Sequence, residues 1–223
     1  ILGNGSDLGI KIRYFVQKKP NGIPEVFTIT KNFIKNDNVM LILGDNIFYG
    51  DSFVDKYIIP AINSKKPHIY GYFKKDPSQY GVVSFDKNYK IKKIVEKPKN
   101  FFSNYAIPGL YIFDEKVYDY TKKLKKSKRG ELEVLDLINL YKMKNEIKLK
   151  IIERGVAWMD MGKPEDLGKA SQFINTLEEN QGQKIACIEE IAYKNNFIDK
   201  KKFQSIINKM PNSNYKNYLK NVE

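Results

Sequence analysis

Two aspartates follow predicted strands and lie close to glycine, an arrangement in which a carboxylate can reach a phosphate or a metal ion. Asp45 comes directly after Val39–Leu43 and Gly44. Five consecutive large apolar residues predict a strand buried on both faces at the centre of a parallel sheet. Ligands of α/β sheets bind where such strands end, and Gly44 lets the backbone turn so that the carboxylate points outward. Asp160, two residues before Gly162 and downstream of another predicted strand, repeats this arrangement.

Both aspartates also have a purely structural interpretation. Asp45 could form an Asx turn, and Asp160 could cap the helix predicted to begin at Pro164. The single histidine, His68, and the single cysteine, Cys187, exclude an internal disulfide and any site that needs several histidines. A metal site must therefore use oxygen ligands, which favours a hard cation such as Mg²⁺.

The composition favours a protein without nucleic-acid or membrane partners. The net charge is +13 over 223 residues, but thirty-six of the thirty-nine basic residues are lysines spread along the whole chain. Nucleic-acid surfaces more often gather arginine and aromatic residues on one element. The sequence contains no apolar stretch of transmembrane length and no signal-peptide pattern at Ile1, so we expect a cytoplasmic protein.

The apolar periodicity predicts an α/β fold with a mixed, mainly parallel sheet flanked by helices. Strands are expected over 11–17, 39–43, 68–73, 80–86, 90–98, 106–113 and 147–152, and helices over 25–33, 53–62, 117–124, 133–141 and 164–179. The first strand, the helix over 25–33 and the strand over 39–43 would form a βαβ unit with a right-handed crossover. Residues 80–86 and 90–98 would pair as a hairpin.

Nine short motifs occur in an order and at intervals that resemble those of bacterial glucose-1-phosphate thymidylyltransferases. They are Val16-Gln17, Gly22, Leu43-Gly44-Asp45-Asn46, Tyr80-Gly81-Val82-Val83, Glu96-Lys97-Pro98, Ser103-Asn104-Tyr105-Ala106, Gly109-Leu110-Tyr111, Arg129-Gly130-Glu131-Leu132-Glu133 and Ala157-Trp158-Met159-Asp160. Each motif alone is weak, but together they cover nearly the entire chain. The resemblance implies a Rossmann-like nucleotidyltransferase core over residues 1–180 and a helical C-terminal extension over 181–223. In the long form of the family, this extension carries an oligomer contact and a regulatory nucleotide site.

The resemblance also implies the reaction and its residues. An oxygen of glucose 1-phosphate would attack the α-phosphorus of dTTP, giving dTDP-glucose for deoxysugar and surface-polysaccharide synthesis. Asp45 and Asp160 would hold one Mg²⁺ between the two substrates, since alignment and charge neutralisation are what phosphoryl chemistry needs. The matching substrate residues are Gln17 and Gly22 for the thymine base, and Asn46, Tyr80, Gly81, Glu96, Lys97 and Ile107 for the sugar phosphate. Glu96-Lys97-Pro98 could instead be an exposed strand end, and Trp158 could be a core aromatic without a ligand role.

The chain also departs from the family pattern. The family begins with a glycine-rich triphosphate loop that carries a catalytic arginine and is followed by a catalytic lysine, and this sequence contains no such motif. We therefore expect a truncated and inactive form. Ile23-Pro24-Glu25-Val26 replaces the family's usual Leu-Ala-Gln-Ala beside the base site, while Met159-Asp160-Met161-Gly162 keeps the carboxylate. The alternatives are a sugar-phosphate-binding or oligomerising fragment without activity, or a related transferase that uses UTP or CTP. A homo-oligomer, tetrameric in the family, is expected.

Overall fold

The structure is a computed structural model and describes residues 2–222. The chain divides into two compact units. The larger unit is Val16–Leu167, and the smaller comprises Ile1–Phe15 together with Gly168–Glu223. The boundary predicted after residue 180 falls inside one helix, α6 (Pro164–Gln181). The division into a nucleotidyltransferase core and a helical extension stays a prediction.

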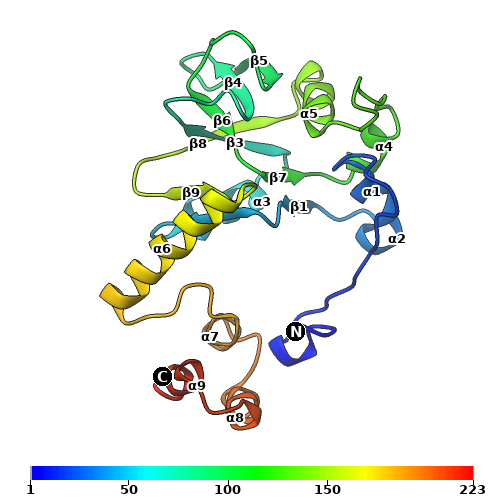
Figure 1. Cartoon of the computed structure of the whole chain (residues 1–223). Coiled ribbons are helices and arrows are strands. Elements are labelled where there is room, and N and C mark those ends of the chain that lie inside the picture. Colours follow the sequence, from blue (N-terminus) through cyan, green and yellow to red (C-terminus); the bar gives the residue numbers. More distant parts are fainter. Residues whose placement is uncertain (1, 223) are drawn as a thin grey trace. The chain divides into compact units, whose positions relative to one another are not determined.

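The larger unit carries the sheet and most of the predicted elements (Figure 1). Its strands are β1 (Val39–Ile42), β2 (Asn46–Tyr49), β3 (His68–Phe73), β4 (Gly81–Phe85), β5 (Ile91–Glu96), β6 (Tyr105–Ile107), β7 (Leu110–Phe113), β8 (Lys148–Ile152) and β9 (Ala157–Asp160). Its helices are α1 (Glu25–Ile29), α2 (Lys31–Ile34), the π-helical turn η2 (Val54–Ile58), α3 (Ile59–Asn63), α4 (Val117–Thr121) and α5 (Val134–Met143). These elements confirm an α/β sheet with flanking helices.

Strand pairing within the described residues is mostly antiparallel. The main sheet has the order β1-β7-β3-β6-β4-β5, and β8 adds to β3 as the one parallel pair. The antiparallel ribbon β2-β9 forms a second, smaller sheet. The predicted hairpin is confirmed as β4-β5, with a bulge between Ser84 and Phe85. The sheet is therefore mixed, as expected, but its centre is not the row of parallel strands that the apolar runs indicated.

The main sheet is buried on both faces because its strands alternate their apolar side chains. Ile69 and Tyr111 pack into a core with α1, α4 and α5, whereas Tyr70 and Ile112 pack into a second core with η2 and α3. Neighbouring residues of one strand point to opposite faces, so each strand serves both cores. Pro60 lies at the start of α3, where its missing N–H is not needed.

Two strand predictions were wrong. Residues 11–17 form no strand, and Tyr14 and Val16 are 69% and 79% exposed. A strand gains its stability from a pairing partner, and no described strand pairs with this segment, so the predicted βαβ unit does not form. Within the described chain β1 pairs only with β7, and Met40 and Ile42 are 48% and 51% exposed. β1 is therefore an edge strand. The prediction of a central strand was wrong because an apolar run does not reveal how many neighbours a strand has.

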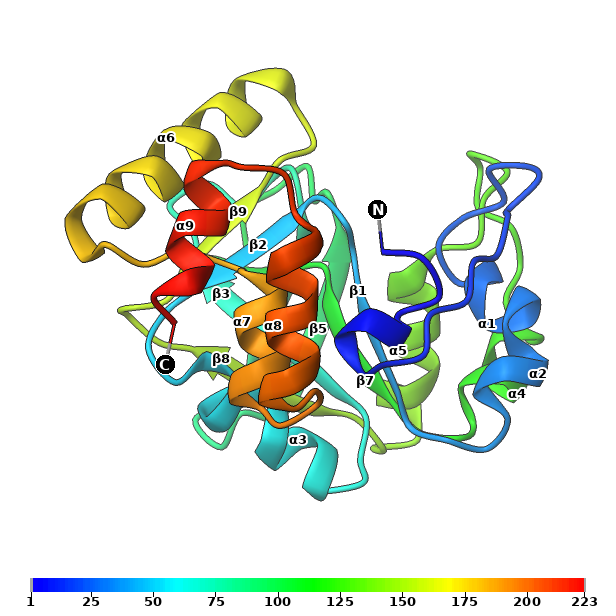
Figure 2. The ribbon, with the colours of Figure 1, turned by 90° about the horizontal axis from the view of Figure 1, so that it is seen from below.

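The smaller unit is helical. Besides most of α6 it contains the short turn η1 (Ser6–Leu8), α7 (Ile188–Lys194), α8 (Lys200–Lys209) and α9 (Asn214–Lys220). The last three helices lie side by side around a core that includes Phe203, Ile207 and Leu219 (Figure 2). Leu8 packs against this core, and Asp7 forms an ion pair with Lys202, so the first residues of the chain belong with its last helices.

Among residues 2–222, no helix combines the length and the apolar character needed to cross a bilayer. The cytoplasmic location stays a prediction.

Candidate active site

A cavity of about 280 Å³ in the larger unit brings together most of the predicted site residues. Eight of the ten line it, and they come from five separate stretches of the sequence: Asp45 and Asn46, Tyr80 and Gly81, Glu96 and Lys97, Ile107, and Asp160. Below, this space is called the carboxylate cavity.

The two aspartates converge through the β2-β9 ribbon. Asn46 and Asp160 are opposite each other in this ribbon, and the amide of Met161 donates a 2.7 Å hydrogen bond to the backbone oxygen of Asp45. A Cβ at Gly162 would lie 3.2 Å from Oδ1 of Asp160 and 3.8 Å from Oδ2 of Asp45. The two carboxylates thus both lie within 4 Å of one point beside Gly162. Gly162 also donates its N–H to Asp160, at 3.0 Å.

The donor chemistry of this pair fits a hard divalent cation. No group of three or more His, Cys, Asp or Glu side chains within residues 2–222 could hold a metal by itself. Mg²⁺ is commonly bound by one or two carboxylates, with waters and substrate phosphates completing its octahedron. Asp45 is exposed and Asp160 is half-buried, so such ligands have access to both.

Asn46 is the hydrogen-bonding centre of the cavity wall. Its side-chain oxygen accepts a bond from Nε1 of Trp158 at 2.7 Å and another from the N–H of Gly109 at 3.0 Å. Its amide nitrogen donates to Oδ1 of Asp45 at 2.7 Å. Trp158 is only 5% exposed and its ring packs edge-on against Tyr72, yet it also lines the cavity. It is both a core residue and a wall residue, two interpretations that the sequence presented as alternatives.

The β4-β5 hairpin and its flanking residues supply another part of the wall. Gly81 is opposite Glu96 in the ladder, and Lys97 donates its N–H to the backbone oxygen of Tyr80 at 2.9 Å. Lys97 has φ 41°, in the left-handed region that residues with a side chain seldom occupy. Such strain persists where the surrounding structure imposes it, and often at functional sites.

Glu96 is open to the cavity, yet the cavity walls remove part of its hydration. Burial raises the pKa of its carboxyl above the ordinary value; Glu133 adds to the rise, and Lys97 acts in the opposite direction. Burial also acts to raise the pKa of Glu133, but the hydrogen bonds from Arg129 and Ser127 and the charge of Arg129 together outweigh it, so the pKa of Glu133 is lowered. The guanidinium of Arg129 binds Glu133 at 2.8 Å, and both side chains line the cavity.

Sequence reasoning assigned no ligand role to Arg129 or Glu133. Both lie in the motif Arg129-Gly130-Glu131-Leu132-Glu133, whose position in the family pattern was the only available signal.

The two residues predicted to read the base do not line the carboxylate cavity. Gln17 donates its amide to the backbone oxygen of Gly22 at 3.0 Å and to Glu25 at 2.6 Å. Gly22 has φ 101°, and a Cβ there would lie 2.0 Å from the backbone oxygen of Leu132, so only glycine fits. The next residue, Ile23, does line the cavity. Glu25 stands where the family usually has glutamine. Its carboxylate accepts a hydrogen bond from the Gln17 amide, the group that was expected to read the thymine base.

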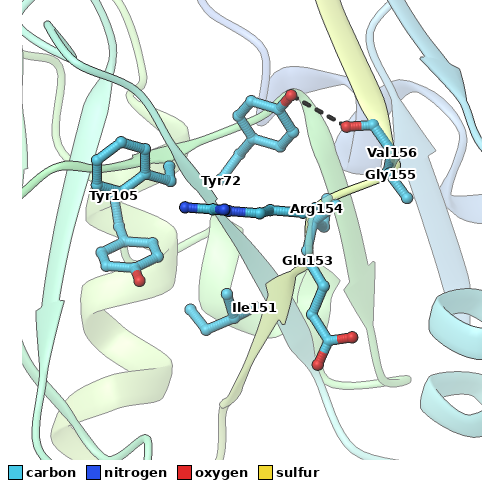
Figure 3. A pocket seen from close by; sticks show the side chains of 9 residues that line it. Tyr72, Tyr105, Ile151, Glu153, Arg154, Gly155 and Val156 are labelled. Atoms are coloured by element: carbon cyan, nitrogen blue, oxygen red, sulfur yellow. Dashed lines mark hydrogen bonds between the residues drawn. The ribbon is translucent and has the colours of Figure 1, made fainter.

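A larger hollow of about 840 Å³ lies elsewhere in the same unit (Figure 3). The guanidinium of Arg154 extends across it between Tyr72 and Ile151, and the hydroxyl of Tyr72 donates to the backbone oxygen of Val156 at 3.0 Å. None of the predicted site residues lines this hollow. Size alone would favour it, but the convergence of carboxylates makes the smaller carboxylate cavity the candidate active site.

Comparisons with known proteins identify the family of the chain. The nucleotidyl transferase family matches residues 1–176, and the chain belongs to this family.

Curated relatives narrow the similarity to one enzyme. The chain is 42% identical to the glucose-1-phosphate thymidylyltransferase of Neisseria gonorrhoeae, over 98% of this chain and 76% of that protein. The enzyme of the same name from Mycobacterium tuberculosis is 37% identical over the same shares of the two chains.

Solved structures show the same similarity. A Bacillus anthracis protein assigned as a glucose-1-phosphate thymidylyltransferase, crystallised with sucrose, superposes with a TM-score of 0.68 at 36% identity, covering 77% of this chain and 68% of that one. A UDP-glucose pyrophosphorylase in complex with UDP-glucose superposes with a TM-score of 0.66 at 21% identity, over 74% of this chain and 66% of that one. At this low identity, the similarity to the UDP-glucose pyrophosphorylase shows a shared fold and nothing more.

Proposed function

We propose that this chain belongs to an enzyme that forms dTDP-glucose and pyrophosphate from dTTP and glucose 1-phosphate, with Mg²⁺ held by Asp45 and Asp160. The observation that carries the proposal is the convergence of these carboxylates beside Gly162, at a cavity that residues of the β4-β5 hairpin also line. The names and identities of the relatives support the choice of substrates. The homo-oligomer stays a prediction.

The residues of the cavity have separable tasks in this proposal. Glu96 accepts hydrogen bonds from sugar hydroxyls, and Lys97 binds the phosphate as a cation. Asn46 fixes the indole of Trp158 on one side and the carboxylate of Asp45 on the other. A bound Mg²⁺ supplies positive charge to the phosphates of both substrates. Because the reaction needs little covalent help from the protein, this alignment provides most of the rate.

Pyrophosphate release tests the proposal. The chain is incubated with glucose 1-phosphate, MgCl₂ and dTTP, UTP or CTP, and binding of glucose 1-phosphate is measured in parallel by calorimetry. We expect glucose 1-phosphate to bind. Because the sequence contains no triphosphate loop, pyrophosphate release should be very slow, and it should be fastest with dTTP. Galactose 1-phosphate is titrated as the comparison ligand. If it binds as tightly as glucose 1-phosphate, the substrate assignment is wrong.

The nucleotide base is tested by comparing dTTP with UTP. The amide of Gln17 is engaged with Glu25, so it is not free to read a thymine imide in this conformation. Equal use of UTP and dTTP would favour a related transferase with a broader base preference. Glu25→Gln, which restores the amide found in the family, should then increase the preference for dTTP.

A further inference from the structure

Lys74 contacts Trp158 and Tyr80, the two aromatic residues that we call the aromatic wall of the carboxylate cavity. It follows β3, and its ammonium nitrogen lies 4.6 Å from the ring centre of Trp158 and 5.0 Å from that of Tyr80. The same nitrogen is 3.5 Å from the hydroxyl oxygen of Tyr80. The backbone is held as well, because Lys74 donates its N–H to the backbone oxygen of Asn104 and accepts a bond from the Asn104 side chain at 3.1 Å.

This ammonium has no carboxylate partner at ion-pair distance among the described residues. A half-buried lysine is normally stabilised by such a partner, and here two ring faces take that place. Burial lowers the pKa of Lys74, while the more distant Asp160 and Asp166 oppose this shift. The side chain therefore places a positive charge close to the carboxylate cavity without neutralising either of its aspartates.

Lys74 itself is not part of the cavity wall, whereas Trp158 and Tyr80 are. Trp158 is held on its other sides by Asn46 and by the ring of Tyr72, which packs against it at 5.4 Å. Figure 3 shows Tyr72 fixed in turn through its hydroxyl to Val156. Lys74 contacts both rings, whose centres lie 5.0 Å apart, so its ammonium links the indole and the phenol.

We propose that Lys74 is a positioning residue for the sugar-phosphate end of the site, where its ammonium clamps Trp158 and Tyr80 in the wall and adds positive charge for an incoming phosphate. This inference rests on the proposed function, because it assumes that a sugar phosphate occupies the carboxylate cavity. It assigns Lys74 no contact with the reacting atoms.

Trp158 is the sole tryptophan of the chain, so its fluorescence reports on the clamp directly. Lys74→Met keeps the length and the aliphatic stem of the side chain but removes the cation, and Lys74→Arg keeps a cation that can stack on the rings. The matched control is Lys75→Met, which makes the same charge change at the exposed neighbouring residue. We expect Lys74→Met to change the emission maximum of Trp158 without ligand, while Lys74→Arg and Lys75→Met keep the wild-type spectrum.

The second measurement is the dissociation constant for glucose 1-phosphate, obtained by calorimetry for the same four proteins, with circular dichroism as a check on folding. Loss of one cation–aromatic clamp should weaken binding by about fivefold in Lys74→Met. Lys74→Arg should restore most of the affinity, and Lys75→Met should leave it unchanged. If Lys74→Met matches Lys75→Met in both spectrum and affinity, the inference is wrong.

Failure of the proposed function would look different. A wild-type chain that binds no glucose 1-phosphate, although Lys74→Met still changes the Trp158 spectrum, would overturn the substrate assignment and the role of Lys74 in ligand binding. The contact between Lys74 and the two rings would remain established.

Discussion

The indole nitrogen of Trp158 donates a 2.7 Å hydrogen bond to the side-chain oxygen of Asn46, a residue 112 positions earlier in the chain. This bond joins β2, which begins directly after Asp45, to β9, which ends at Asp160. Asn46 also touches Asp45 and Gly109, so one side chain sets the position of an aromatic wall and of a carboxylate.

The first prediction concerns this bond. Asn46→Ala leaves the Nε1–H of Trp158 and the N–H of Gly109 without an acceptor, and an unsatisfied buried donor costs about 1–3 kcal/mol. The free energy of unfolding, measured with urea and circular dichroism, should fall by about that amount. Asn88→Ala, in the exposed hairpin turn, is the control and should change it by less than about 0.5 kcal/mol. In a Trp158→Phe background the cost of Asn46→Ala should shrink; equal costs in both backgrounds would mean that the bond contributes nothing.

The second prediction concerns the pH dependence of stability. The pKa of Glu96 is raised in the folded protein, so between its unfolded and folded pKa values the folded state holds the extra proton. The free energy of unfolding therefore falls as pH rises through this window, and the loss remains at neutral pH. Glu96→Gln should be more stable than wild type at pH 7 and should converge with it toward pH 4, while it binds glucose 1-phosphate more weakly.

Urea unfolding at several pH values between 4 and 7 checks this prediction, with Glu115→Gln, at an exposed position, as the control. A stability difference that is the same at every pH would contradict the assignment of the raised pKa to Glu96.

The third prediction concerns the edge strand β1. Its outer edge has no strand partner within the described residues, and Met40 and Ile42 expose apolar side chains on one face. Unpaired apolar edges favour association, so this chain should self-associate or aggregate. Ile42→Lys should reduce the mass found by light scattering, whereas Phe101→Lys, at a residue 72% exposed outside the sheet, should not. A monodisperse wild-type monomer with a cooperative thermal transition would rule out association through this edge.

The fourth prediction compares the two substrates. The predicted sugar-phosphate residues line the carboxylate cavity, while Gln17 and Gly22 lie outside its wall. This chain should therefore bind glucose 1-phosphate more tightly than dTTP in calorimetric titrations. The reverse order of affinities would place the nucleotide, and not the sugar phosphate, in this cavity.

The residues of this site were predicted from the family resemblance, whereas several of the elements that carry them followed from short-range patterns. The hairpin β4-β5 and the strand β3 were predicted because alternating apolar residues and turn residues act locally. The edge position of β1 and the lack of a strand over residues 11–17 were not predicted. Both depend on which distant segment, if any, pairs with these residues. Asn46 and Trp158 were each noticed in the sequence, but a hydrogen bond between residues so far apart leaves no local signal. The same holds for Lys74, whose role depends on two rings from other elements.

The central claim is that Asp45 and Asp160 bind one divalent cation together. It is tested most directly by the affinity of the chain for Mn²⁺, an electron-paramagnetic substitute for Mg²⁺, in the presence of dTDP-glucose. Wild type is compared with Asp45→Asn, Asp160→Asn and the double variant, and Asp86→Asn in the β4-β5 turn is the control.

If the two carboxylates share the ion, each single substitution should weaken Mn²⁺ binding by about tenfold or more, and the double variant should lose little beyond that, because ligands of one centre are not additive. Asn caps helices about as well as Asp, so a purely structural role predicts no change in Asp160→Asn. Wild-type Mn²⁺ affinity in Asp160→Asn would contradict the account.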